Sequence, residues 1–215
     1  MSFGDGLPRQ FLEPMKGKTA AFRLNGRSSN LKFAAAVVGL LAGARMGCRI
    51  LDLDAFYSSN LETLAANAPR EGLSDIDLDI PEPDSDMEVI LTELFLGDDN
   101  RLILIDSVNS LYQLLSARNP KAASRKFSFF MSALSSWSSS NGGPAIATLY
   151  DRRPATHRRT SRSLADSFDV SVSVASKPNG LAFRCERGSA WRGGSFFLPF
   201  EDGQVEAHEH RERDE

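Results

Sequence analysis

The sequence predicts an α/β protein with a mostly parallel sheet flanked by helices and antiparallel strands added at the C-terminal end. Two observations predict this fold class. Between residues 19 and 151, short aliphatic segments alternate with helical ones, the pattern of a parallel sheet with crossover helices. From Phe168 onward, apolar and polar residues alternate strictly, which is typical of antiparallel strands with one solvated face.

Four segments have the composition of buried parallel strands. Arg101–Ser107 is the clearest, because four consecutive aliphatic residues precede an aspartate and a serine. Between the strands, apolar spacing predicts helices, the first of them apolar almost all round and therefore buried. The predicted strands are 19–25, 48–54, 101–107 and 143–151, and the predicted helices are 31–42, 59–68, 87–96 and 121–138.

The C-terminal part of the sheet is predicted as a hairpin and one further strand. Residues 168–176 and 180–187 alternate in polarity, and Lys177-Pro178-Asn179-Gly180 between them has the composition of a tight turn. Residues 195–200 form the last strand. We expect one domain over residues 1–205 and a charged, disordered tail over residues 206–215.

Composition excludes several classes of protein. The chain has 215 residues, 41% of them hydrophobic and 25% charged, as in an ordinary globular protein. Its longest apolar run, 33–44, is shorter than the roughly 20 residues that span a bilayer, and the first residues lack a secretory signal pattern. We therefore expect no membrane partner and a cytoplasmic protein, or a nuclear one in a eukaryote. Cys48 and Cys185 form no metal or disulfide pattern, and no triad or metal site is predicted around His157, His208 or His210.

Charge is distributed unevenly around a net value of −3. Residues 71–88 hold eight acids and no base, and Pro81 and Pro83 argue against regular structure there. This acidic segment is either a solvated loop, a docking site for a basic partner, or a nucleic-acid mimic that folds over the basic residues. Residues 152–162 hold five arginines and one histidine and no acid. This basic segment has the chemistry of phosphate contacts, while the alternative is a solvated loop.

A loop-like motif follows the first strand. GRSSNLKF, residues 26–33, has the length of the phosphate-binding pattern G-x-x-x-x-G-K-[ST], with Gly26 at its first position and Lys32 at its lysine. Leu31 stands at the second glycine, where a side chain obstructs close approach to a phosphate, and Phe33 stands where a hydroxyl would hold Mg²⁺. The motif is either a degenerate nucleotide site or an ordinary polar turn before a helix.

Carboxylates follow two of the predicted strands. Asp52 and Asp54 end one, and Asp106 with Ser107 ends another. Carboxyl ends of parallel strands are where such sheets bind ligands. The alternatives are a helix N-cap at Asp106–Ser107 and a solvated strand end at Asp52 and Asp54.

In this order, the motifs resemble the RecA/RadA superfamily of ATPase cores over about residues 15–205. The loop at 26–33 is similar to its Walker A, ILDLDAFYSSNLETL to its second strand, and LILIDSVNSLYQLL to its Walker B. The resemblance implies a single RecA-like core domain, similar to a short paralogue such as RadB or KaiC-like proteins. It assigns Asp54 to water orientation and Asp106 to metal orientation. The implied nucleotide-pocket remnant is Gly26, Lys32, Asp54, Asp106 and Ser107.

The resemblance also puts the basic segment where recombinases contact DNA. The implied nucleic-acid-binding residues are Arg152, Arg153, His157, Arg158, Arg159 and Arg162. The first hypothesis is therefore a non-catalytic recombinase paralogue that binds DNA and assists recombination or repair. Single-stranded DNA is the preferred ligand. The chain would assemble with a recombinase or another paralogue in an oligomer. The second is an inactive scaffold subunit of a hetero-oligomer, similar to Elongator's small subunits or KaiC-like regulators. The third is a weak ATPase. No cofactor is required, and weak ATP and Mg²⁺ binding stays open.

Overall fold

The computed structural model of the chain describes residues 6–25, 27–66, 68–81, 87–95, 101–150 and 164–200, and within them eight strands form one sheet. The strands are β1 (Thr19–Leu24), β2 (Cys48–Asp52), β3 (Ile76–Asp79), β4 (Leu102–Asp106), β5 (Ala145–Tyr150), β6 (Val170–Lys177), β7 (Gly180–Arg187) and β8 (Ser195–Pro199). The helices are α1 (Leu7–Leu12), α2 (Arg27–Ala44), α3 (Phe56–Ser59), α4 (Leu61–Ala66), α5 (Met87–Leu94), α6 (Val108–Arg118) and α7 (Pro120–Asn141), with 3-10 turns at Glu13–Met15, Arg70–Asp75 and Arg192–Gly194.

The sheet has the strand order β3-β2-β4-β5-β1-β6-β7-β8. All neighbouring pairs from β3 to β6 are parallel, and β7 and β8 add antiparallel strands after β6. Lys177 pairs with Gly180 across the predicted turn. The predicted fold class is therefore confirmed, including the change from parallel to antiparallel pairing.

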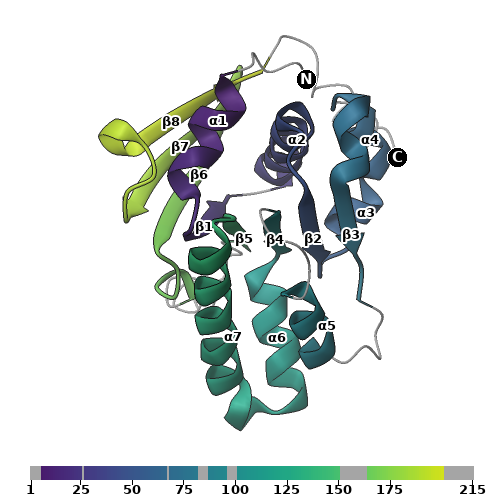
Figure 1. Cartoon of the computed structure of the whole chain (residues 1–215), viewed down its shortest axis with the longest axis vertical. Coiled ribbons are helices and arrows are strands. Elements are labelled where there is room, and N and C mark those ends of the chain that lie inside the picture. The colour runs from purple at the N-terminus through teal and green to yellow at the C-terminus, as the bar shows by residue number, and fades with distance from the viewer. Residues whose placement is uncertain are drawn as a thin grey trace.

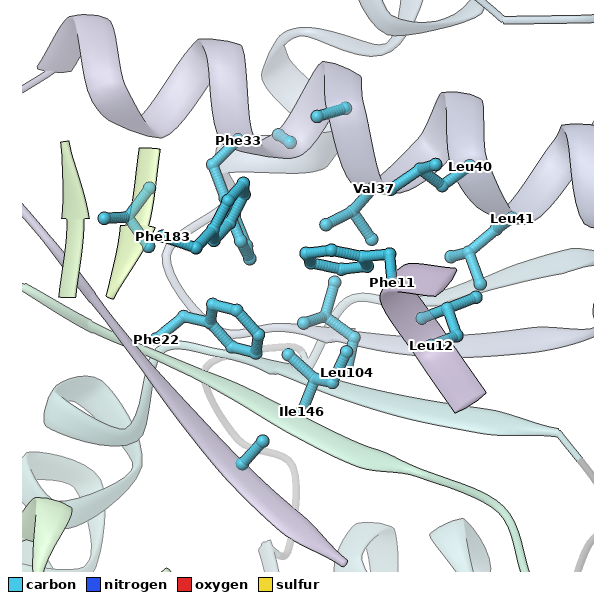
Figure 2. Packing of buried hydrophobic residues seen from close by; sticks show 14 of the residues in the cluster. Phe11, Leu12, Phe22, Phe33, Val37, Leu40, Leu41, Leu104, Ile146 and Phe183 are labelled. Carbon is cyan, nitrogen blue, oxygen red and sulfur yellow. The ribbon is translucent and has the colours of Figure 1, made fainter. Parts of the chain in front are cut away.

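Helices cover both faces of the sheet (Figure 1), with α1 to α4 on one side and α5 to α7 on the other. Because successive residues of a strand point to opposite faces, Leu102 and Leu104 of β4 pack with α2, while Ile103 and Ile105 pack with α6 and α7. On the α2 side, the rings of Phe11, Phe22, Phe33 and Phe183 lie close together between α2 and the sheet (Figure 2). Phe11 and Phe183 have ring centroids 5.0 Å apart in an edge-on arrangement.

The acidic segment is one place where the structure differs from the prediction. The acidic segment contains β3, so the expectation of irregular structure is wrong over residues 76–79. Asp77 and Asp79 of this edge strand form ion pairs with Arg101 and Arg49, which lie far away in sequence. Those distant partners compensate the like charges that made a strand look unfavourable.

Helix α1, near the N-terminus, was not predicted because its six residues are too few to show a helical period. Both free cysteines belong to strands, Cys48 buried and Cys185 partly exposed. A search for membrane spans, made over the described residues, finds no helix with the length and hydrophobicity to cross a bilayer.

Gly72 lies against the end of α2, and we expect Gly72→Ala to lower the free energy of unfolding by about 1–3 kcal/mol. A Cβ at this position would lie 2.2 Å from the carbonyl oxygen of Ala42 and 2.5 Å from its Cα. These are backbone atoms, so the helix itself must shift. Urea unfolding of the variant measures the loss.

The matched control is Gly43→Ala, one residue further along α2. Gly43 is exposed, and a Cβ there meets no atom within 4 Å. Alanine should therefore stabilise the helix by about 0.5–1 kcal/mol. Equal unfolding midpoints for the two variants would contradict the close approach at Gly72.

Candidate functional site

The carboxylates predicted from the strand ends lie together at the carboxyl edge of the sheet. β2 and β4 are parallel neighbours, and Asp52 and Asp106 are opposite one another in register. The chain then turns so that the backbone N–H of Leu53 donates to the carbonyl oxygen of Asp106 at 2.7 Å. This turn carries Asp54 to the start of the helix that follows β4.

Asp54 is held by two serines. The Ser107 hydroxyl donates to Oδ2 of Asp54 at 2.6 Å, and the Ser110 hydroxyl donates to its Oδ1. Ser107 is also the N-cap of α6, because its Oγ accepts from the backbone N–H of Ser110 at 3.3 Å. The predicted N-cap at the strand-to-helix junction is therefore present, and it is Ser107 that makes it.

Asp106 is completely buried, with 0% of its surface exposed. The hydroxyls of Thr148 and Tyr150, both on β5, donate to its Oδ1, while Oδ2 has no partner among the described residues. Burial raises the pKa of Asp106 to about 6, because the loss of hydration outweighs the two hydrogen bonds that favour the carboxylate. The negative charges of Asp54 and Asp52 raise it further.

Asp52 is buried as well, with 1% of its surface exposed, so the alternative of a solvated strand end is wrong for this residue. Its two carboxylate oxygens accept the backbone N–H groups of Phe56 and Ser58, each at 2.8 Å. Asp52 thereby satisfies the free N–H groups at the start of α3, which has no side-chain cap of its own.

The motif at 26–33 is helical over most of its length. Helix α2 begins at Arg27, so only Asn25 and Gly26 separate it from β1. Phe33 is 1% exposed and points from α2 into the aromatic cluster, 5.2 Å from Phe22 between ring centroids (Figure 2).

Lys32 is half-buried in the second turn of α2. Within the described part of the chain, no hydrogen bond or ion pair joins Lys32 to Asp54, Asp106 or Ser107. The structure therefore brings the two aspartates and Ser107 together and leaves Lys32 outside their hydrogen-bond network.

Seven of the predicted site residues lie outside the described residues: Gly26, Arg152, Arg153, His157, Arg158, Arg159 and Arg162. The strand that leads into the basic segment is described. β5 runs parallel to β1 and β4, so Tyr150 stands at the carboxyl edge and its hydroxyl contacts Asp106. No cluster of histidine, cysteine, aspartate and glutamate that could hold a metal occurs among the residues the structure describes.

Three residues around Asp106 were not predicted. Thr148 and Tyr150 are separated by two positions on β5 and share one face of the sheet. Two hydroxyls at this spacing in an aliphatic strand are the signal that could have found them. Tyr57 has a buried hydroxyl with no partner among the described residues. Burial and the charge of Asp106 raise its pKa well above the ordinary value, as they do for Tyr150.

No protein-family model matches the sequence, and no curated protein matches it. Among solved structures, the crystal structure of the RadB recombinase is similar, with a TM-score of 0.65 and 16% sequence identity. The match covers 86% of this chain and 88% of that chain. Identity this low shows the fold alone. The chain therefore shares the fold of that structure, a mixed α/β sheet flanked by helices, which agrees with the RecA-like fold that the order of its motifs implied.

Proposed function

We propose that this chain is a non-catalytic RecA/RadA-like recombinase paralogue that binds DNA and assists recombination or repair together with a protein partner. The observation that carries the DNA part is the position of the basic segment in the chain. It begins directly after β5, whose last residue Tyr150 stands at the carboxyl edge beside Asp106. Parallel α/β sheets bind their ligands at this edge.

The non-catalytic part rests on a poor fit to a Mg²⁺–nucleotide. Residues 27–31 are helical where a phosphate-binding loop would expose its backbone N–H groups, and Phe33 is in the core where a hydroxyl would hold the metal. Asp106 is buried with Oδ1 taken by two hydroxyls, and both oxygens of Asp54 accept from serines. We infer that these groups belong to hydrogen-bond networks inside the fold and that the chain requires no nucleotide cofactor.

The test of the DNA proposal is fluorescence anisotropy with a labelled 30-nucleotide single strand and the matching duplex over a range of salt concentrations. If the five arginines contact about five phosphates, log affinity should fall against log salt with a slope of roughly −4. Replacing Arg158 and Arg159 with alanine should lower the affinity about tenfold at low salt and flatten the slope by roughly 1.5.

The matched control replaces two exposed arginines near the β8 edge of the sheet with alanine, Arg184 on β7 and Arg192 just before β8. This variant has the same net charge as the test variant, so it should bind DNA more tightly than the test variant at every salt concentration. Absence of binding by the wild type at low salt, or equal losses in the two variants, would remove the DNA proposal.

One observation favours the weak-ATPase alternative. Lys32, Asp54 and Asp106 occupy the positions that the nucleotide-site motifs assign to a lysine and two carboxylates. A titration with a fluorescent ATP analogue and Mg²⁺ separates it from our proposal. We expect no saturable binding at micromolar nucleotide and the same result with Lys32→Ala. Saturable binding that Lys32→Ala abolishes would favour a nucleotide-dependent protein.

A further inference from the structure

Residues of α5, α6 and α7 line an apolar groove of about 610 Å³. These three helices lie on the opposite side of the sheet from α2 (Figure 1). Leu91 of α5, Leu115 of α6 and Phe130 of α7 line it and are buried, with 7%, 6% and 4% of their surfaces exposed. Phe95 follows α5 and packs on Phe130, with ring centroids 5.7 Å apart. The groove therefore has a firm hydrophobic floor contributed by three helices.

An aromatic side chain at the rim of the groove is exposed to solvent. Phe129 lines the groove and has 76% of its surface exposed, the largest value among the exposed large hydrophobic residues described. Its neighbours Phe127 and Phe130 belong to the buried core on this side of the sheet and are 4% exposed, so the core does not depend on a hydrophobic residue at 129. An exposed aromatic beside an apolar groove is typical of a surface that a partner covers.

Among the described residues that line the groove, two are basic and none is acidic. The two basic residues that line the groove are Arg125 and Lys126. The sequence from 107 to 150, which contains α6 and α7, has no aspartate or glutamate. Its charged residues are Arg118, Lys121, Arg125 and Lys126. Glu93 lies nearby on α5, but it does not line the groove. A ligand that buries apolar groups in this groove should therefore bind more tightly if it carries carboxylates at its ends. Added lysine or arginine should weaken its binding.

We propose that this groove binds a short apolar segment of a partner protein flanked by aspartate or glutamate, docked as an amphipathic helix on α5 and α7. Its volume falls within the range of about 300–1,000 Å³ for pockets that hold ligands. An apolar helix face laid in a groove between helices is a common mode of peptide recognition. The interaction needs neither DNA nor nucleotide, so it stands independently of the proposed function.

The chain's own acidic segment is a weaker candidate for the occupant in a second copy. In its described part, Asp77 and Asp79 already pair with Arg101 and Arg49, and β3 is hydrogen-bonded into the sheet. Moving these residues into the groove of another copy would break those pairs. A separate acidic partner has no such cost.

The experiment selects ligands from a phage-displayed library of random 12-residue peptides on the full-length chain, with counter-selection on Phe129→Ser. Phe129 is exposed, so this variant should keep the fold. We expect the peptides enriched on the wild type to carry two or more large apolar residues flanked by aspartate or glutamate. The best peptide, labelled and titrated, should bind at least about tenfold more weakly to Phe129→Ser and to Arg125→Glu.

Two matched controls separate the groove from general effects. Leu61→Ser removes an exposed apolar side chain on α4, across the sheet, and Lys121→Glu makes the same charge change as Arg125→Glu on α7 outside the groove. Each should change the affinity by less than about threefold. No enrichment over Phe129→Ser, or enriched peptides rich in lysine and arginine, would overturn the proposal. So would a concentration-dependent dimer in sedimentation equilibrium that Phe129→Ser abolishes, because a second copy would then be the occupant.

Discussion

Replacing Phe33 with threonine should destabilise the protein by about 3–5 kcal/mol and should not create a nucleotide site. A phosphate-binding loop carries serine or threonine at this position, so the substitution restores the hydroxyl of the motif while Leu31 still occupies the position of its second glycine. Phe33, however, is 1% exposed and its ring lies 5.2 Å from that of Phe22 and 6.4 Å from that of Phe183. The variant would leave a cavity among these rings and bury a hydroxyl in it.

Urea unfolding followed by circular dichroism measures the loss, and a titration with a fluorescent ATP analogue and Mg²⁺ tests the gain. The control is Phe33→Leu, which keeps an apolar side chain and should cost about 1–2 kcal/mol. A threonine variant with wild-type stability that binds nucleotide saturably would show that Phe33 blocks an intact site. That result would also remove the non-catalytic part of our proposal.

The stability of the wild-type protein should carry a pH-dependent contribution from Asp106 that Asp106→Asn removes. Burial raises the pKa of Asp106 from 3.8 to about 6, so the folded state binds the proton more tightly than the unfolded state. The resulting stabilisation is complete below pH 4 and is lost as the pH rises through about 6. Two pKa units correspond to about 3 kcal/mol.

Unfolding free energies of the wild type and Asp106→Asn, measured in urea between pH 4 and pH 7.5, test this directly. The variant should gain about 2 kcal/mol relative to the wild type across that range, because the other titrating groups are common to both proteins. Tyr150→Phe removes a hydrogen bond to the carboxylate and should move the loss to higher pH. Parallel pH profiles for the wild type and Asp106→Asn would contradict a raised pKa.

Local patterns in the sequence were enough to predict most of the sheet. The aliphatic run before Asp106 and the strict alternation after Phe168 predicted β4 and the β6–β7 hairpin close to their observed bounds. These signals are local because a strand's periodicity and the number of its buried faces are set by consecutive residues. The same patterns placed Asp54, Asp106 and Ser107 at one edge.

Long-range contacts decided what these residues do. The spacing of Thr148 and Tyr150 shows that they share one face of β5, but it does not show that both donate to Asp106, some 40 residues away in sequence. Nor does a local pattern show that Arg49 and Arg101 pair with the carboxylates of β3. Side-chain pairing and burial depend on which strands become neighbours.

The motif at 26–33 shows most clearly which features follow from the sequence and which follow from the tertiary structure. The sequence by itself determined that a helix follows the first strand and that this helix is buried. Only the tertiary structure decided that the helix begins at Arg27 and that Phe33 enters an aromatic cluster completed by Phe183, 150 residues further along the chain. A helix start is stabilised by whatever the helix packs against, and here one of the packing partners, Phe183, comes from β7 near the C-terminal edge of the sheet.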